Sequence, residues 1–280
     1  MGAIADLTSW LFIPASQERF VRSALASGAS VFILDLEDSI PSHQKADARA
    51  ALPAMVAALC GAGCPIYVRV NKGDADDLVA CAQLQIDGVM FPKAESAHDI
   101  EQAVAIYAAA GGRRTGFVAA IESALGVLNA LEIARASCVT GLMFGTGDFV
   151  AETGFALTPE ALAGPATMIA LAANAAGIDA IGLPASIAEF RDLEALRVTA
   201  LAARSLGYSG TPIIHPAQVA TIHEAFRPTA DEADAARRIV AAYEATEGGA
   251  TAVQGKLIER PVYLQAQSVL KRAAIGEPVL

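Results

Sequence analysis

The chain is short of basic residues, and this shortage restricts the partners it can bind. It contains 20 lysines and arginines but 30 aspartates and glutamates, which gives a formal net charge of -10 at pH 7. Nucleic acids and anionic membranes bind proteins through basic faces, so neither is expected as a partner. An anionic small molecule would have to be held by a few locally placed cations.

Long apolar runs and paired cysteines are missing as well. No apolar run reaches the roughly 18 residues of a membrane-spanning helix, and the chain does not open with a charged segment followed by an apolar one. Cys60, Cys64, Cys81 and Cys138 show neither the spacing of zinc ligands nor a secretory context. We therefore expect a soluble, cytoplasmic protein with reduced structural thiols.

The chain is rich, by contrast, in a repeated unit of a short apolar strand and a helix. Hydrophobic residues make up 54% of the 280 positions, and runs such as 31–34 and 117–121 are typical of parallel strands covered on both faces. Eight such units fit into about 225 residues, as in a (β/α)₈ barrel. An open doubly wound sheet would show a glycine fingerprint after its first strand, and residues 14–19 contain none. We predict an α/β fold, a (β/α)₈ TIM barrel over 8–228 with a C-terminal helical extension over 229–280.

Some local features are also predicted. The helix that follows Ser42 is expected to break or kink at Pro53, residues 124–136 are expected to be a helical segment, and residues 189–206 are expected to form a helix. The extension is expected to contain two helices, separated by a turn and by the segment 254–261. It could pack on the barrel, cap the site or reach into a neighbouring subunit.

Polar residues gather where the predicted strands end. Barrel enzymes build their sites at the C-terminal ends of the strands, so we place the active site there. The residues concerned are Asp35, Glu37, Arg69, Lys93, Glu122, Asp148 and His215.

Glu122 and Asp148 end two apolar runs and would lie at the same end of one sheet, beside a glycine-rich turn. Burying either carboxylate alone has a large desolvation cost, which a hard divalent cation would offset. We predict that they bind Mg²⁺, with Mn²⁺ as the alternative ion. The competing interpretation is that each acid caps the helix that follows it.

Arg69 lies in the apolar strand 65–71, where a guanidinium is costly unless it meets an anion. It could bind a substrate carboxylate through two parallel hydrogen bonds, or pair with Asp35 or Glu37 across the sheet. Both arrangements could hold in different ligand states.

Other basic residues also allow more than one role. Lys93 could contact substrate, form a Schiff base or supply a supporting charge, and its proline and glutamate neighbours favour the supporting charge. Arg19 and Arg22 could hold thioester phosphates or be solvated helix charges. His215 is expected to be a structural histidine at a strand end and not the base.

Eight short motifs occur in a fixed order over almost the whole chain, and together they resemble one family. They are Leu11-Phe-Ile-Pro with Glu18-Arg19-Phe20, Asp35-Leu-Glu-Asp38 with Lys45 and Arg49, Arg69-Val-Asn71, Phe91-Pro-Lys93, Ile121-Glu122-Ser-Ala, Phe144-Gly-Thr-Gly-Asp148, Ile214-His-Pro with Gln218, and Gly255-Lys-Leu-Ile-Glu259-Arg-Pro. The chain is similar to the citrate lyase beta subunit family, within the wider group of HpcH/HpaI-type aldolases and malyl-CoA lyases.

The resemblance implies a Mg²⁺-dependent lyase that breaks or forms a carbon–carbon bond in a β-hydroxyacyl thioester, such as citryl-, malyl- or citramalyl-CoA. Its other partners would be a 2-oxo acid and an acyl thioester of CoA or of an acyl carrier protein. By resemblance, Glu122 and Asp148 hold the metal, while Glu37 and Asp38 support its water ligands, and we add Lys93 to these supporting residues. The predicted substrate-binding residues are Arg69, Gly147, Asp148 and Arg19.

Three positions depart from the family pattern. Ala15 replaces the usual glycine after the first-strand proline, and the segment 182–184 lacks the usual acid of the seventh strand, so the thioester pocket could differ in shape. Glu259 stands where the family has an aspartate, in a segment that its members tend to lend to a neighbouring subunit as the acid/base. We therefore predict Glu259, with Arg69, as a catalytic residue of a homotrimer. A displacement of about 1 Å in such a group can cost on the order of 10²-fold in rate.

Two other functions compete with the thioester lyase. One is a pyruvate-type class II aldolase that needs no CoA, and the other is a catalytically silent subunit of a lyase complex. A silent scaffold has no reason to keep a costly charge cluster at an apolar barrel mouth, which counts against the second alternative.

Overall fold

The computed structural model describes residues 7–17, 19–246 and 249–275. They form two compact units, one over Leu7–His223 and the other built on the segment from Glu224 onward. The division falls at 223/224, whereas the sequence-based boundary was placed at 228/229. Glu18, from the first resemblance motif, lies outside the described residues.

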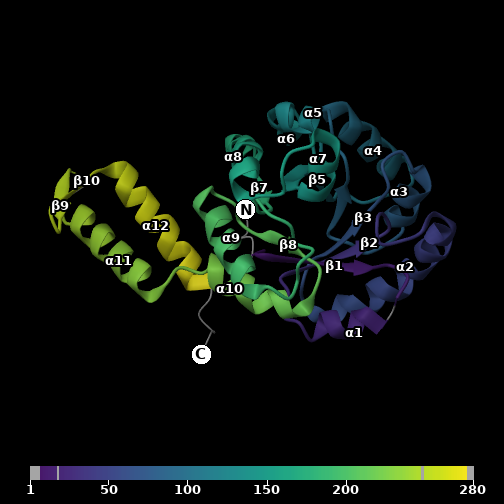
Figure 1. Cartoon of the computed structure of the whole chain (residues 1–280), viewed down its shortest axis with the longest axis horizontal. Coiled ribbons are helices and arrows are strands. Elements are labelled where there is room, and N and C mark those ends of the chain that lie inside the picture. Colours follow the sequence, from purple (N-terminus) through teal and green to yellow (C-terminus); the bar gives the residue numbers. More distant parts are fainter. Residues whose placement is uncertain (1–6, 18, 247–248, 276–280) are drawn as a thin grey trace. The chain divides into compact units, whose positions relative to one another are not determined.

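Eight parallel strands form the centre of the larger unit, in the order β7-β6-β5-β4-β3-β2-β1-β8 (Figure 1). Between the first and last members of this order, Ile181 and Gly210 form a parallel bridge, and the Ser209 N–H donates to the carbonyl oxygen of Ala180 at 2.8 Å. The barrel is thereby nearly closed, which confirms the predicted fold. The strands are β1 (Ser9–Pro14), β2 (Val31–Asp35), β3 (Ile66–Arg69), β4 (Gly88–Phe91), β5 (Gly116–Ile121), β6 (Val139–Phe144), β7 (Asp179–Ile181) and β8 (Thr211–Ile213).

Helices surround these strands on the outside (Figure 1). Among the described residues, no helix is both long enough and apolar enough to cross a bilayer. The helices are α1 (Arg19–Leu25), α2 (Lys45–Leu59), α3 (Ala75–Ala82), α4 (Ala97–Ala109), α5 (Ala124–Leu128), α6 (Ala130–Arg135), α7 (Thr146–Thr153), α8 (Pro159–Ala176), α9 (Leu193–Ser205) and α10 (Val219–Phe226), the last of which spans the division between the units.

Side-chain caps fix where several of these helices begin. Ser96, Ser123, Thr158 and Asp192 each accept a hydrogen bond from a backbone N–H in the first turn of the helix that follows. A cap of this kind is typically worth about 1 kcal/mol. Gly177 ends α8 in the left-handed conformation, with φ at 70°, which glycine adopts without the Cβ penalty of other residues.

Several local predictions were wrong. Pro53 does not break α2, because the buried face of that helix continues on both sides of it, and packing outweighs the roughly 3 kcal/mol cost of an interior proline. The segment 124–136 is helical, as predicted, but it consists of two helices that meet at Asn129. The helix predicted at 189–206 begins only at Leu193, after its Asp192 cap. The sequence analysis also missed α7, which directly follows β6.

The barrel interior below the strand ends is filled with side chains. Trp10 and Tyr67 pack with their ring centroids 4.9 Å apart, and the Trp10 indole N–H donates to the carbonyl oxygen of Leu7 at 2.7 Å. Gly88 is needed beside them, because a Cβ there would lie 2.0 Å from the Tyr67 ring. The interior is therefore a packed core, as in other barrels of this type. The buried members of this core are Trp10, Val31, Ile33, Tyr67, Met90, Val118, Ala120, Met143 and Ile181.

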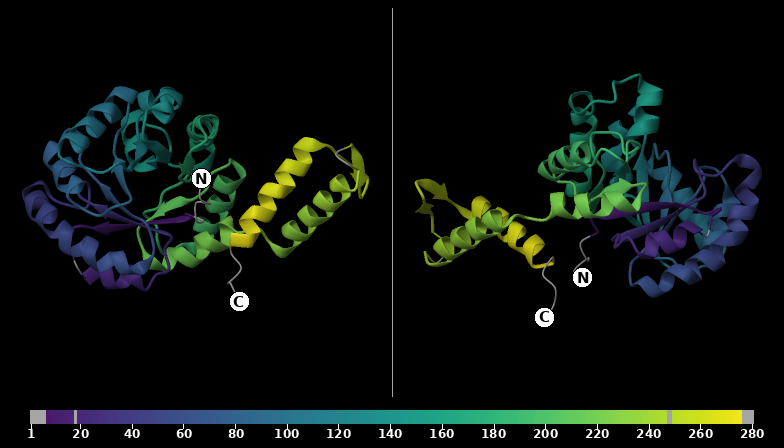
Figure 2. Two further views of the ribbon diagram at one scale, coloured as in Figure 1. Left: turned by 180° about the vertical axis from the view of Figure 1, so that it is seen from behind. Right: turned by 60° about the horizontal axis from the view of Figure 1, so that its bottom comes forward.

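The smaller unit is a helical hairpin tipped by a β-hairpin (Figure 2). Helices α11 (Ala230–Glu244) and α12 (Arg260–Ile275) pack against each other, and the short antiparallel strands β9 (Thr251–Val253) and β10 (Lys256–Ile258) lie between them in sequence. Both residues of the connecting turn, Gln254 and Gly255, have positive φ, as in a type I′ hairpin turn. The sequence analysis missed this hairpin, since strands of three residues carry almost no periodic signal. How this extension packs on the barrel or on a neighbouring subunit stays a prediction.

Candidate active site

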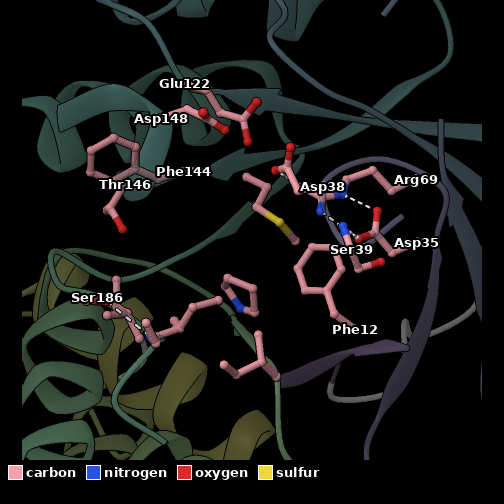
Figure 3. A pocket seen from close by; sticks show the side chains of 18 of the residues that line it. Phe12, Asp35, Asp38, Ser39, Arg69, Glu122, Phe144, Thr146, Asp148 and Ser186 are labelled. Carbon is pink, nitrogen blue, oxygen red and sulfur yellow. Dashed lines mark hydrogen bonds and ion pairs between the residues drawn. The ribbon is translucent and has the colours of Figure 1, made fainter. Parts of the chain in front are cut away.

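A cavity of about 500 Å³ lies at the C-terminal ends of the barrel strands (Figure 3). Its lining divides into a charged part, contributed by the ends of β2, β3, β5 and α7, and an apolar part, contributed mainly by β1, β6, β8 and the loop after β7. The charged residues are Asp35, Asp38, Arg69, Glu122 and Asp148, and the larger apolar residues are Phe12, Pro14, Met143, Phe144, Leu183, Ile187, Pro212 and Ile214.

Arg69, the last residue of β3, is held by its strand neighbour Asp35. Its Nε lies 2.6 Å from Asp35 Oδ1 and its Nη2 lies 2.8 Å from Asp35 Oδ2, while the guanidinium carbon lies 4.7 Å from the centre of the Phe12 ring. The remaining nitrogen, Nη1, lies 2.9 Å from Glu37 Oε2 and 3.4 Å from Asp38 Oδ2. Two arrangements were considered for Arg69, and the structure contains the ion pair with Asp35 and Glu37 across the sheet. Nη1 is the part of the guanidinium that faces the exposed Asp38.

The Asp35–Arg69 pair is charged over the whole physiological pH range. Burial alone would raise the pKa of Asp35, but the hydrogen bonds and charge of Arg69 outweigh burial and hold that pKa below its ordinary value. Burial would lower the pKa of Arg69, yet Asp35 raises it further above its already high value. The guanidinium is therefore a permanent and rigidly placed cation.

Glu122, directly after β5, is a buried carboxylate with little positive charge around it. Its side chain is close to Gly145, where a Cβ would lie 2.4 Å from Glu122 Oε1, so glycine leaves the space that this acid occupies. Burial raises the pKa of Glu122 to about 7, and the charges of Glu37 and Asp148 add to this effect. Ser123, and not Glu122, caps α5, so the structure does not support the capping role considered for Glu122.

Asp148 lies in the first turn of α7 and is well exposed to the cavity. The N-cap of α7 is Gly145, which forms no side-chain cap, so Asp148 does not have the capping role either. The Thr146 hydroxyl donates to the carbonyl oxygen of Ala185 at 2.9 Å and ties the start of α7 to the loop after β7. Gly147 also lines the cavity.

Lys93, just after β4, contacts the acids on both sides of it. Its backbone N–H donates to Glu122 Oε2 at 2.9 Å, and its ammonium donates to Glu37 Oε1 at 2.9 Å. The ammonium is also 3.9 Å from Asp148 Oδ2. Burial raises the pKa of Glu37, although the Arg69 and Lys93 charges oppose this. The structure thus brings together Glu37, Asp38, Arg69, Lys93, Glu122 and Asp148, all of which the sequence analysis had selected.

A partly buried polar network, centred on the fully buried Asp77, supports the acidic turn from behind. The Lys45 ammonium donates to the carbonyl oxygens of Leu36 and Glu37, each at 3.2 Å, and to the side-chain oxygen of Asn71. The Asn71 amide donates to the same Leu36 oxygen at 3.0 Å and to Asp77 Oδ2 at 2.7 Å. The sequence analysis missed Asp77, although its place one helical turn before the buried Cys81 marks it as an acid on the inner face of α3.

We expect Asp77→Ala to destabilise the protein by about 3 kcal/mol, because it leaves charged and polar donors buried without their acceptor. Asp77 is fully buried and lies 2.8 Å from Arg49. Asp76→Ala is the matched control, since Asp76 is 81% exposed and 3.9 Å from the same arginine, and a surface pair of this kind contributes less than about 1 kcal/mol. Urea unfolding of both variants measures the difference, and equal losses would contradict the role of the network.

Three residues from the sequence analysis lie elsewhere. Arg19 is exposed on α1 and lines a separate surface cavity together with Arg22. His215 accepts a hydrogen bond from the Ala217 N–H and stacks on Phe190 with ring centroids 4.8 Å apart, in keeping with a structural role. Glu259 follows β10 in the smaller unit and is exposed there.

The charged part of the cavity fits a hard divalent cation. Within the ranges that the structure describes, no three His, Cys, Asp or Glu side chains are already arranged as a metal cage. Mg²⁺ does not need one, because it commonly binds through one or two carboxylates and keeps several waters. Glu122 and Asp148 supply such a pair, and a bound cation would offset the burial and the neighbouring acids that raise the pKa of Glu122.

Residues 8–216 match the family described as HpcH/HpaI aldolase/citrate lyase, and the chain belongs to this family. This confirms the resemblance drawn from the sequence motifs.

Individual relatives cover nearly the whole chain. A (3S)-malyl-CoA thioesterase from Cereibacter sphaeroides is 33% identical, over 95% of this chain and 94% of the relative. A citrate lyase subunit beta-like protein from Mycobacterium tuberculosis is 34% identical, over 94% of each chain. The crystal structure of protein CitE from Mycobacterium tuberculosis in complex with magnesium, acetoacetate and coenzyme A superimposes with a TM-score of 0.81 at 32% identity, over 95% of this chain and 98% of that one.

Proposed function

We propose that the protein is a Mg²⁺-dependent carbon–carbon lyase. It would cleave a β-hydroxyacyl thioester such as citryl-, malyl- or citramalyl-CoA into an acyl thioester and a 2-oxo acid, or run the reverse condensation. One observation carries this proposal: a carboxylate pair and a fixed guanidinium share a single cavity with an apolar chamber. The related CitE structure, which contains magnesium, acetoacetate and coenzyme A, supports the same reading.

Glu122 and Asp148 would hold the metal. When bound, Mg²⁺ acts as a Lewis acid toward the oxygens of the substrate. Arg69 and the N-terminus of α7 would bind the substrate carboxylate, because the first N–H groups of a helix lack intrahelical acceptors and attract anions. Asp38 lies 3.4 Å from Arg69 Nη1 and is exposed, so we expect a substrate carboxylate to take its place there.

The apolar part of the cavity would receive the acyl thioester. A second cavity of about 180 Å³ shares Phe12, Pro14 and Ile214 with the first and continues between β1, β8 and α1. We propose that the thioester arm follows this route toward α1, where Arg19 and Arg22 could meet its phosphates. Leu183 and Ile187 would exclude water from the reacting carbon, which protects an enolate from stray protonation.

In the cleavage direction the substrate hydroxyl gives its proton to a water molecule and becomes the carbonyl group of the 2-oxo acid, while the electrons of the broken carbon–carbon bond pass to the α-carbon of the thioester. The enolate formed there takes a proton from the carboxyl group of Glu259, supplied by a neighbouring subunit of a homotrimer. In condensation the Glu259 carboxylate removes a proton from the acyl methyl group.

The thioesterase relative makes hydrolysis a second candidate function. One assay separates the two, with malyl-CoA or citramalyl-CoA as the substrate and parallel detection of 2-oxo acid and of free thiol. A lyase releases 2-oxo acid without thiol, and EDTA abolishes the release. Release of thiol without 2-oxo acid would overturn the lyase proposal in favour of a thioesterase. Turnover of the free hydroxy acid alone would also overturn it and would favour a CoA-independent aldolase. If no substrate is turned over, the remaining alternative is a catalytically silent subunit of a lyase complex.

A further inference from the structure

Lys93 is the residue that connects the three acids around the proposed metal position. Its backbone N–H binds Glu122, its ammonium binds Glu37, and the same ammonium lies 3.9 Å from Asp148. These acids come from three different elements, the turn after β2, the end of β5 and the first turn of α7. The ammonium charge therefore lies between Glu37 and Asp148, while the backbone N–H of the same residue holds Glu122.

The backbone of Lys93 is shaped for these contacts. Its φ is 51°, in the left-handed region that residues with a Cβ rarely adopt, and such conformations persist only where surrounding contacts impose them. Lys72 supplies one of these contacts, because its ammonium donates to the carbonyl oxygen of Lys93 at 2.7 Å and also lies 3.2 Å from both Glu95 and Asp99. As a result, the N–H and the side chain of Lys93 both reach the acids.

Because the acids of the site carry more negative charge than the nearby cations neutralise, the Lys93 ammonium and a metal ion would compete for the same carboxylates. Glu37 and Glu122 are each only 6% exposed, so their negative charges are poorly screened. Arg69 pairs with Glu37 through Nη1 at 2.9 Å, but its other two nitrogens are bound to Asp35, so this one guanidinium cannot neutralise the whole group. The side chain of Lys93 is 42% exposed, which leaves it a path to solvent.

We propose that Lys93 is a displaceable counter-ion, whose ammonium balances Glu37 and Asp148 when the metal is absent and moves aside when Mg²⁺ binds, while its backbone N–H continues to hold Glu122. The assignment rests on the proposed function for the position of the metal. Lys93 then stabilises the metal-free protein and weakens metal binding. An anionic substrate restores negative charge at the site, so Mg²⁺ and the ammonium can be held together once substrate has arrived. Metal binding is thereby coupled to substrate binding.

The test compares Lys93→Met, which keeps the side-chain length without the charge, with wild type in two measurements. Isothermal calorimetry gives the Mg²⁺ affinity with and without oxalate, and thermal unfolding in EDTA gives the metal-free stability. We expect Lys93→Met to bind Mg²⁺ about tenfold more tightly, because the cation that competes with the metal for these carboxylates is removed. We also expect it to melt at a lower temperature in EDTA and to show a smaller gain in Mg²⁺ affinity from oxalate.

Three further variants sharpen the comparison. Lys93→Gln is a second neutral variant, to be used if the methionine variant does not fold, and Lys93→Arg retains the charge and should stay near wild type. Lys271→Met removes an exposed charge from α12 and controls for net charge. Unchanged or weaker Mg²⁺ binding in the neutral Lys93 variants would overturn the proposal, since Lys93 would then merely hold the acids in place. If wild type itself binds no Mg²⁺, the metal site and the proposed function fail together.

Discussion

Glu122→Gln should remove Mg²⁺ binding, lower turnover on the order of 10³-fold and, at the same time, make the metal-free protein more stable above neutral pH. The loss of turnover follows because several kcal/mol of charge stabilisation disappear with the metal, at about 1.4 kcal/mol per factor of ten. The gain in stability follows because Glu122 is a buried acid beside two other acids.

The pH dependence has a definite sign. The pKa of Glu122 is raised from 4.5 to about 7 in the folded protein, so between these values the folded state binds a proton that the unfolded state has released. The stability of the metal-free protein therefore falls as pH rises through this window. At about 1.4 kcal/mol per pH unit, the loss approaches about 3 kcal/mol above pH 7.

Thermal unfolding at pH 5.5 and pH 8, in EDTA and in Mg²⁺, measures these effects. In EDTA, Glu122→Gln should melt near wild type at pH 5.5 and above it at pH 8, and Mg²⁺ should raise the melting temperature of wild type alone. Glu160→Gln, an exposed acid in the first turn of α8, is the control and should behave as wild type. An equal Mg²⁺ response in wild type and Glu122→Gln would place the metal elsewhere.

Glu259→Gln should lower turnover by about 10² to 10⁴-fold, the usual contribution of a positioned proton-transfer group, without changing Mg²⁺ affinity. Glu259→Asp should retain activity, because it keeps a carboxyl group and restores the residue typical of the family. Comparing turnover in the two variants shows whether activity is lost because the acid is missing or because the packing of the side chain has changed.

Mixing tests whether Glu259 acts on a neighbouring subunit. Asp148→Asn and Glu259→Gln, each inactive alone, are dissociated, combined and reassociated. If Glu259 acts across subunits, some sites in mixed trimers contain both intact residues and activity returns. If it acts within its own chain, every site lacks one residue and the mixture stays inactive. If light scattering shows that the active protein is a monomer, Glu259 cannot act on a neighbouring subunit, and the mixing experiment is not needed.

The sequence predicted the barrel and most of its mouth because both follow from simple rules. The apolar run at 31–34 is fully buried, as expected for a central parallel strand. Since parallel strands end at the same edge, Asp35, Arg69 and Glu122 could be brought together without knowledge of any contact. The same rule selected Lys93, although it could not reveal that this lysine reaches three acids.

Other features could not be read from the pattern of residues. Whether Arg69 binds Asp35 or a ligand is decided by side-chain distances of 2.6 and 2.8 Å, which periodicity does not encode. Helix α7 begins in a glycine-rich turn without a side-chain cap, so it carried no start signal. Asp77 looked like an ordinary acid in a first helical turn, and although its spacing to Cys81 places it on the inner face of α3, its partners Arg49 and Asn71 are seen only in the structure.

The weak closure of the barrel between β7 and β8 affects how this site can change in evolution. Both strands have three residues, and a single bridge joins Ile181 to Gly210, whereas β5 and β6 are paired over five positions. Apolar residues of the chamber, such as Leu183 and Ile187, follow this seam, while the charged residues lie on the well-paired side. Substitutions along this seam can therefore reshape the apolar chamber while Arg69 and Glu122 keep their positions on the well-paired side. Asp148 is more sensitive, because the Thr146–Ala185 hydrogen bond ties the start of α7 to the loop after β7. Under the proposed function, such changes in the chamber would alter which substrate is accepted while the charged residues stay the same.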